Sequence, residues 1–145
     1  MSISASIDLV FDREVSPVTL IETLINFGWS VNDNGHISYL PLSDDDQFDW
    51  EWCDINRWSS VLSILTSKAA LKETVGLALT WEDSNIGGEI LILSDGRNIC
   101  FSLTSNRKEI NNNSYTDFSW YLGKIIEPLC RSGFYPVKIE CEHLR

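Results

Sequence analysis

The feature that most constrains the fold is a series of three strand-like segments joined by two tight turns. Apolar residues recur at every second position in Val75–Trp81 and again in Ile99–Thr104, which is the period of a strand with one buried face. Glu89–Leu93, between them, is apolar on both faces, which indicates a central strand. The two connections contain Asn, Asp and Gly, which favour hairpin turns. Strands joined by such short connections run antiparallel, so the sequence predicts an antiparallel meander.

Further strands are expected on either side of this meander. Apolar and polar residues alternate from Ile3 to Phe11, which predicts a half-buried strand, and Tyr135–Cys141 is predicted to be the last strand. Trp29–Val31 and His36–Leu42 flank an Asn-Asp-Asn-Gly turn, an arrangement that is typical of a β-hairpin. These segments extend the predicted sheet on both sides of the meander.

Three other segments carry apolar residues at helical spacing and predict helices. The first follows Ser16 and Pro17, a capping residue and a first-turn proline. The third follows Ser114–Asp117, which resembles a capping box, and it contains Pro128, which is expected to bend or shorten its last turn. The predicted helices lie between Ser16 and Gly28, from about Ile55 to Leu71, and between Ser114 and Gly133.

The predicted element order is β-α-β-β-α-β-β-β-α-β. Tight turns between strands favour a mostly antiparallel sheet, and about three helices are available to cover it. At 145 residues the chain is long enough to bury a hydrophobic core, and it leaves little room for a second domain. We therefore expect a single α+β domain over residues 1–145.

The sequence also predicts a cytoplasmic protein. Its first residues lack the basic region of a secretory signal peptide, and Asp8 and Asp12 interrupt what would be the apolar region. No apolar run approaches the ~20 residues that are needed to span a bilayer. The four cysteines contain no CxxC pair, so we expect reduced thiols rather than a disulfide framework. They are Cys53, Cys100, Cys130 and Cys141.

The net charge of the chain lies entirely in its first two-fifths. The chain has 11 basic and 21 acidic residues and a formal net charge of −10. Acids and bases balance in residues 57–145, whereas six acids fall within residues 44–54 alone. Such acidity opposes binding to nucleic acid or to an anionic membrane through a basic surface, so we expect neither as a partner.

Few residues of the chain are suited to catalysis or to metal binding. There are two histidines, His36 in a predicted hairpin strand and His143 near the C-terminus, and there is no GxSxG motif or phosphate-binding glycine loop. Cys141 and His143 lack the paired short spacings of a zinc site. The consecutive Asp44–Asp46 lack the ligand spacing of a calcium loop. We therefore expect no enzymatic activity, no cofactor and no bound metal.

The acidic segment, residues 44–54 with the sequence DDDQFDWEWCD, combines two properties of a protein interface. Its carboxylates attract a basic partner, and its aromatic side chains provide a desolvated centre. Closely spaced carboxylates also imitate a row of phosphates, so a basic nuclease is a partner of suitable charge. We predict that the contact residues are Asp44, Asp45, Asp46, Phe48, Asp49, Trp50, Glu51, Trp52 and Asp54.

In size, acidity and layout, the whole chain resembles the immunity proteins of bacterial toxin–immunity systems, above all those of contact-dependent growth inhibition and related polymorphic toxins. The resemblance implies tight, stoichiometric inhibition of one cognate toxin domain, often a nuclease. It carries over no individual residue, because it rests on no shared motif. Two other functions stay open. One is a nucleic-acid mimic that inhibits a DNA-binding enzyme, and the other is a small hydrolase that uses the paired carboxylates of Asp49 and Glu51.

Overall fold

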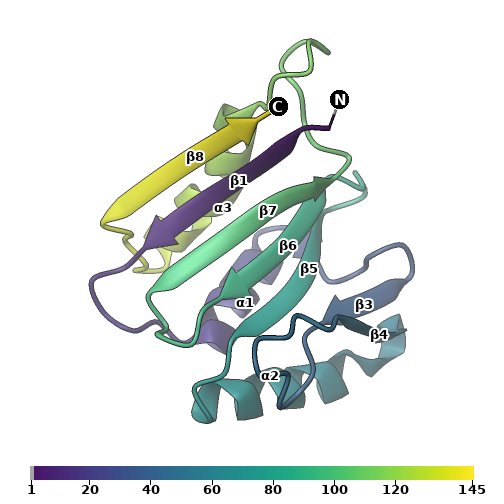
Figure 1. Cartoon of the computed structure of the whole chain (residues 1–145), viewed down its shortest axis with the longest axis vertical. Helices are drawn as coiled ribbons and strands as arrows, with labels where there is room; N and C mark the ends of the chain where they lie inside the picture. The colour runs from purple at the N-terminus through teal and green to yellow at the C-terminus, as the bar shows by residue number, and fades with distance from the viewer. Residues whose placement is uncertain (1) are drawn as a thin grey trace.

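The predicted meander forms the middle of one antiparallel sheet in the computed structural model, which describes residues 2–145 (Figure 1). Its strands are β5 (Val75–Trp81), β6 (Gly87–Ile92) and β7 (Asn98–Ser105). β6 lies between the other two, as expected for a strand that is apolar on both faces. This part of the sequence-based prediction is confirmed.

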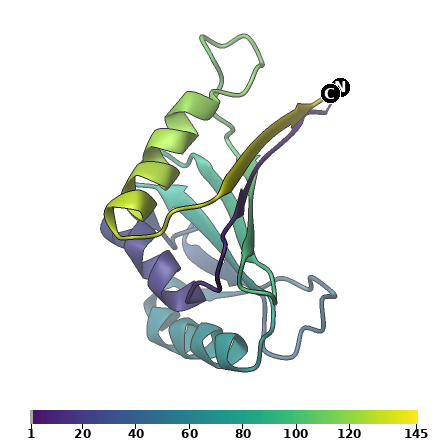
Figure 2. The same ribbon diagram turned by 90° about the vertical axis from the view of Figure 1, so that its left-hand side faces the viewer.

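The sheet extends from the meander to eight strands. On one side β1 (Ser4–Val10) pairs with β7, and β8 (Lys138–Leu144) pairs with β1 and forms the edge. On the other side β3 (His36–Tyr39) pairs with β5, and β4 (Glu51–Asp54) forms the opposite edge. β2 (Trp29–Ser30) also pairs with β5. The pairing of β1 with β8 places the two ends of the chain side by side (Figure 1, Figure 2).

Within residues 2–145, three helices cover one face of the sheet, and the other face carries no helix (Figure 2). They are α1 (Pro17–Asn26), α2 (Trp58–Ala70), which follows a 3-10 turn at Ile55–Arg57, and α3 (Phe118–Arg131). We call the surface without helices the open face. The α+β fold class predicted from the sequence is confirmed. The core between helices and sheet includes Ile7, Leu24, Leu65, Leu77, Ile90, Phe101, Tyr121 and Ile125.

The turn of the predicted hairpin of Trp29–Val31 with His36–Leu42 forms, since Asp33 and His36 exchange backbone hydrogen bonds, but the flanking strands do not pair with each other as predicted. Only an isolated bridge joins Asp33 to His36, and β2 and β3 instead lie along β5. The physical reason is an aromatic contact, because Trp29 lies opposite Trp81 with their ring centroids 5.5 Å apart in an edge-to-face arrangement. A local turn signal does not reveal this pairing, because the two tryptophans are far apart in the sequence.

Four further details differ from the prediction: the start of α3, the effect of Pro128 on its length, the start of β8 and an additional strand, β4. The cap of α3 is Asp117 rather than Ser114, since the Asp117 carboxylate accepts the backbone N–H of Trp120 at 3.2 Å. The helix continues through Pro128 to Arg131 and is not shortened by the proline. β8 begins at Lys138, later than the predicted Tyr135. β4 is an additional strand that the element order did not include.

The structure also bears on the cysteines and on membrane insertion. All four cysteines are free thiols; Cys141 is exposed and the other three are half-buried. Within residues 2–145, no helix combines the length and the apolar character needed to cross a bilayer.

Candidate partner-binding surface

A buried ion pair holds the base of the loop that begins the acidic segment. Lys68, on α2, is 1% exposed, and its ammonium donates to the carbonyl of Pro41 at 2.6 Å and to the carboxylate of Glu73 at 3.2 Å. The same oxygen of Glu73 accepts the backbone N–H of Ser43 at 2.8 Å. These three bonds fix the chain on both sides of Leu42, immediately before the acidic residues.

Asp44 organises the loop from inside. It is only 8% exposed, and its two carboxylate oxygens accept the backbone N–H groups of Phe48 at 2.9 Å and of Asp49 at 3.0 Å. Its own carbonyl accepts the N–H of Gln47 at 3.1 Å. The carboxylate of Asp44 is thus satisfied within the loop, and its role in the structure is to shape the segment that presents the other acids.

The two central tryptophans of the acidic segment lie in different environments. Trp50 is half-buried, and the tip of its ring lies against Gly76 of β5, within 3.0 Å of the point where a Cβ atom would stand. Trp52, on β4, is 66% exposed and packs on the ring of His36, with the centroids 4.4 Å apart. Trp50 therefore anchors the loop to the sheet, whereas Trp52 offers a large apolar surface to solvent.

The remaining predicted contact residues are exposed. Asp54 and Trp52 share the open-face side of β4, since their cross-strand partners His36 and Ser38 alternate with the buried Ile37. Asp49 precedes the first residue of β4, Glu51, so strand alternation does not align these two carboxylates in the manner a paired-carboxylate site requires. The exposed members of the set are Asp45, Asp46, Phe48, Asp49, Glu51, Trp52 and Asp54.

The open face adds acids that come from other parts of the chain. One cross-strand row joins Glu140 of β8, Asp8 of β1 and Cys100 of β7. The next row contains Glu142 of β8 and Glu89 of β6, with serines on the strands between them. The connection from β3 to β4, which carries the start of the acidic segment, projects on the same side of the sheet (Figure 2).

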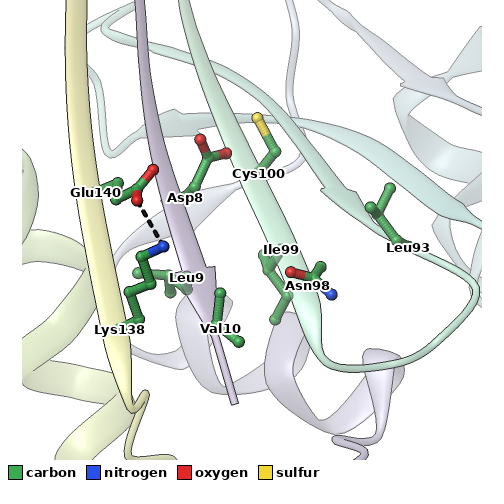
Figure 3. A pocket seen from close by; sticks show the side chains of 9 residues that line it. All are labelled: Asp8, Leu9, Val10, Leu93, Asn98, Ile99, Cys100, Lys138 and Glu140. Carbon is green, nitrogen blue, oxygen red and sulfur yellow. Dashed lines mark ion pairs between the residues drawn. The ribbon is translucent and has the colours of Figure 1, made fainter.

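A shallow hollow lies on the open face between β1, β7 and β8 (Figure 3). Its volume is about 270 Å³, and its polar lining residues are Asp8, Asn98, Cys100, Lys138 and Glu140. Lys138 and Glu140 form an ion pair at 2.7 Å. Burial, together with the neighbouring carboxylate of Asp8, raises the pKa of Cys100 to about 11. The thiol stays protonated at neutral pH and is a poor nucleophile. The lining of the hollow can therefore contribute charges and hydrogen bonds to a contact, but not a reactive thiolate.

Glu89 occupies an unfavourable position when it is ionised. Burial raises the pKa of its carboxyl group above the ordinary value, and the charge of Asp33 raises it further. A half-buried carboxylate with an acidic neighbour is stabilised by a cation that approaches from the open face.

Replacing Asp44 by alanine is expected to lower the free energy of unfolding by about 2 kcal/mol, because the backbone N–H groups of Phe48 and Asp49 lose the carboxylate that accepts their hydrogen bonds. Asp49→Ala is the matched control, since Asp49 is exposed and its removal is expected to cost roughly 0.5 kcal/mol or less. Urea denaturation of the two variants measures the difference. Equal stabilities would contradict the structural role of Asp44.

Glu89→Gln is expected to stabilise the protein at pH 7. Because the pKa of Glu89 is raised in the folded state, stability falls as pH rises from the ordinary value of 4.5 through the raised pKa. Glutamine has no such penalty, so its advantage should disappear below pH 4.5, where Glu89 is protonated in both states. Melting temperatures across this pH range test the prediction, with the exposed Glu82→Gln as control. A pH-independent difference would contradict it.

Asp8, Glu89, Glu140 and Glu142 are the acids that sequence reasoning did not place in the site. The available signal is their alternation with apolar residues in three strands, but this pattern does not show which face the helices leave uncovered. Among residues 2–145, no group of three or more His, Cys, Asp or Glu side chains is arranged to hold a metal ion. Comparison with protein-family models, with curated proteins and with solved structures finds no match for this chain.

Proposed function

We propose that this protein is an immunity protein that binds and neutralises a cognate toxin domain with a basic, nuclease-like surface. Its contact surface is the exposed part of the acidic segment together with the acids of the open face. Binding takes place in the cytoplasm and requires no catalysis by this chain. The observation that carries the proposal is the separation of charge between the two layers of the fold.

This separation follows from the positions of the charged residues in the elements. The three helices carry two acids and three bases, whereas the eight strands carry six acids and one base. Carboxylates on one face raise the association rate of a basic partner and orient it before contact. The strand acids are Asp8, Glu51, Asp54, Glu89, Glu140 and Glu142, and the base is Lys138. All of these except Glu51, which lies opposite the buried Tyr39, are on the open-face side of their strands.

Two exposed aromatic side chains supply the apolar part of the surface. Trp52 is 66% exposed and Phe48 is 45% exposed, and both belong to the acidic segment. Aromatic residues surrounded by charged ones are typical of the energetically dominant positions of protein interfaces. Together with the exposed acids they support a protein partner more than a small-molecule ligand.

The spread of acids along the sheet favours a second candidate function. Asp8, Glu89, Glu140 and Glu142 lie on three different strands, outside the acidic segment. Carboxylates distributed over an elongated face can occupy the site of a nucleic-acid backbone. Inhibition of a DNA-binding enzyme by mimicry of its substrate is therefore the alternative, and it predicts competition with DNA.

The test uses the polypeptide encoded by the reading frame immediately upstream, expressed with and without this protein. We expect that it arrests growth alone and that co-expression restores growth. In purified form, Asp45→Asn/Asp46→Asn should slow association and weaken its salt dependence with little change in dissociation. Trp52→Ala should speed dissociation roughly thirtyfold, which corresponds to about 2 kcal/mol.

Glu22→Gln/Glu127→Gln is the matched control, since it removes two negative charges from α1 and α3 on the opposite layer. We expect its binding kinetics to equal those of the wild-type protein. The proposal is overturned if the Asp and Trp variants fold normally and protect as well as the control does. Competition by duplex DNA distinguishes the substrate-mimic mechanism from binding elsewhere on the toxin.

A further inference from the structure

β8 is an edge strand that is exposed over nearly its whole length. It pairs with β1 on one side, and six of its seven residues are exposed. The opposite edge, β4, is only four residues long. Long exposed edges offer unpaired N–H and C=O groups to another strand, and proteins usually protect them with charges, prolines or bulges.

The side of β8 that faces the helix layer carries apolar residues that α3 does not cover. Ile139 is 42% exposed, and Val137 and Tyr135, which precede the strand, are 63% and 66% exposed. Cys141 is also exposed. On the other side, Lys138 and Glu140 point toward the open face and form an ion pair at 2.7 Å (Figure 3). The edge is therefore apolar on one side and charged on the other.

The sequence around Ile139 is complementary to itself in the antiparallel direction. With a two-fold axis at Ile139, Lys138 lies opposite Glu140 of a second copy, Val137 lies opposite Cys141, and the two isoleucines meet at the axis. Opposite charges on directly facing strand positions are stabilising, and each pair occurs twice by symmetry. An axis at Cys141 would instead place Glu140 opposite Glu142 twice, which is destabilising. An axis at Glu140 would place Lys138 opposite Glu142 twice, but it would also make the two Glu140 side chains face each other. Charge therefore favours the axis at Ile139.

The backbone supports the same register. The N–H of Phe11 donates to the carbonyl of Arg97, on the β7 side. By alternation, Val10 and Asp8 direct their backbone groups to β8, where they pair with Lys138 and Glu140. The backbone groups of Ile139 and Cys141 therefore point away from β1. An axis at Ile139 makes the two copies of Ile139 a hydrogen-bonded pair, and their backbone groups are available for it.

We propose that β8 is a self-association surface, on which a second copy of this chain pairs antiparallel about Ile139 and extends the sheet across a two-fold axis. This surface lies apart from the acidic segment, shares Glu140 with the open face, and does not depend on the proposed immunity function. A contact between two short strands is small by the standard of stable interfaces, which bury roughly 1,200–2,000 Å². We therefore expect a reversible monomer–dimer equilibrium that depends on concentration.

Charge exchange tests the register on the whole protein. In a dimer of the Lys138→Glu variant, a carboxylate at position 138 faces the carboxylate of Glu140 in both cross-strand pairs. In a dimer of the Glu140→Lys variant, an ammonium group at position 140 faces that of Lys138 in both pairs. Each variant alone should therefore dimerise about tenfold more weakly than wild type. A mixture of the two variants restores both opposite-charge pairs and should form heterodimers. Sedimentation equilibrium over a dilution series measures these affinities, and circular dichroism verifies the fold of each variant.

A second comparison isolates the backbone contribution. Cys141→Pro and Cys141→Ala both remove the thiol, but only proline removes an outward N–H, and neither removes a bond to β1. The proline variant should dimerise about tenfold more weakly than the alanine variant. The proposal is overturned if the wild-type protein stays monomeric over the dilution series, if the mixed charge variants fail to associate, or if proline and alanine at position 141 give equal affinities.

Discussion

Replacing Lys68 by methionine is expected to lower the free energy of unfolding by about 3 kcal/mol. The ammonium group is 1% exposed and bonds to both Glu73 and the carbonyl of Pro41. Methionine fills a similar volume but leaves a carboxylate and a carbonyl without their donor. Urea denaturation measures the loss, and faster hydrogen exchange of the Ser43 amide should accompany it, since Glu73 is the acceptor of that amide.

Lys72→Met is the matched control for this prediction. Lys72 also forms an ion pair, with Glu14 at 2.7 Å, but both side chains are more than half exposed. Exposed ion pairs contribute roughly 0–1 kcal/mol, so the control should cost little. If the two variants lost the same stability, the buried pair would not be the clamp that holds the acidic segment.

Gly88→Ala is expected to destabilise the protein by about 3 kcal/mol or more. A Cβ atom on Gly88 would overlap the carbonyl oxygen of Ser102 on the neighbouring strand, and backbone cannot move aside as a flexible side chain can. Gly88 lies where the register between β6 and β7 shifts, immediately before Glu89. Gly88 therefore permits the shift in register between β6 and β7 that comes directly before Glu89, whose half-buried carboxyl group lies on the open face.

Gly123→Ala serves as the control for the glycine substitution. Gly123 lies inside α3, and a Cβ atom there would meet no atom within 4 Å. Alanine in a helix interior is more stable than glycine by roughly 0.5–1 kcal/mol, so this variant should melt at a higher temperature than the wild type. Thermal unfolding of both variants measures the contrast, and a similar loss in both would contradict the steric explanation.

Local patterns were sufficient for the elements whose partners are close in the sequence. The meander of β5, β6 and β7 follows from alternation and turn residues, because its strands are neighbours along the chain. The start of α1 follows from Ser16 and Pro17, and the Ser16 hydroxyl accepts the N–H of Thr19 at 3.3 Å. The acidic segment is equally visible in the sequence, since it needs only composition to be recognised.

Long-range contacts decided the features that the patterns did not show. β2 pairs with β5, where Trp29 packs on Trp81, and β4 pairs with β3, where Cys53 packs against the core opposite the buried Ile37. The periodicity of α2 does not show whether Lys68 is buried or exposed. Lys68 is buried and holds the loop because its ammonium bonds to the carbonyl of Pro41 and to Glu73. Such contacts join residues whose proximity no local preference encodes.

The sequence by itself determined that this protein has a strongly acidic segment with aromatic residues and a mainly antiparallel sheet. Only the tertiary structure decided that Asp44 and Trp50 hold the loop in place while Trp52 and the remaining acids face solvent. It also decided that Asp8, Glu89, Glu140 and Glu142 share the open face. The physical reason is that strand alternation assigns side chains to two faces, whereas the packing of all three helices on one of them determines which face stays accessible.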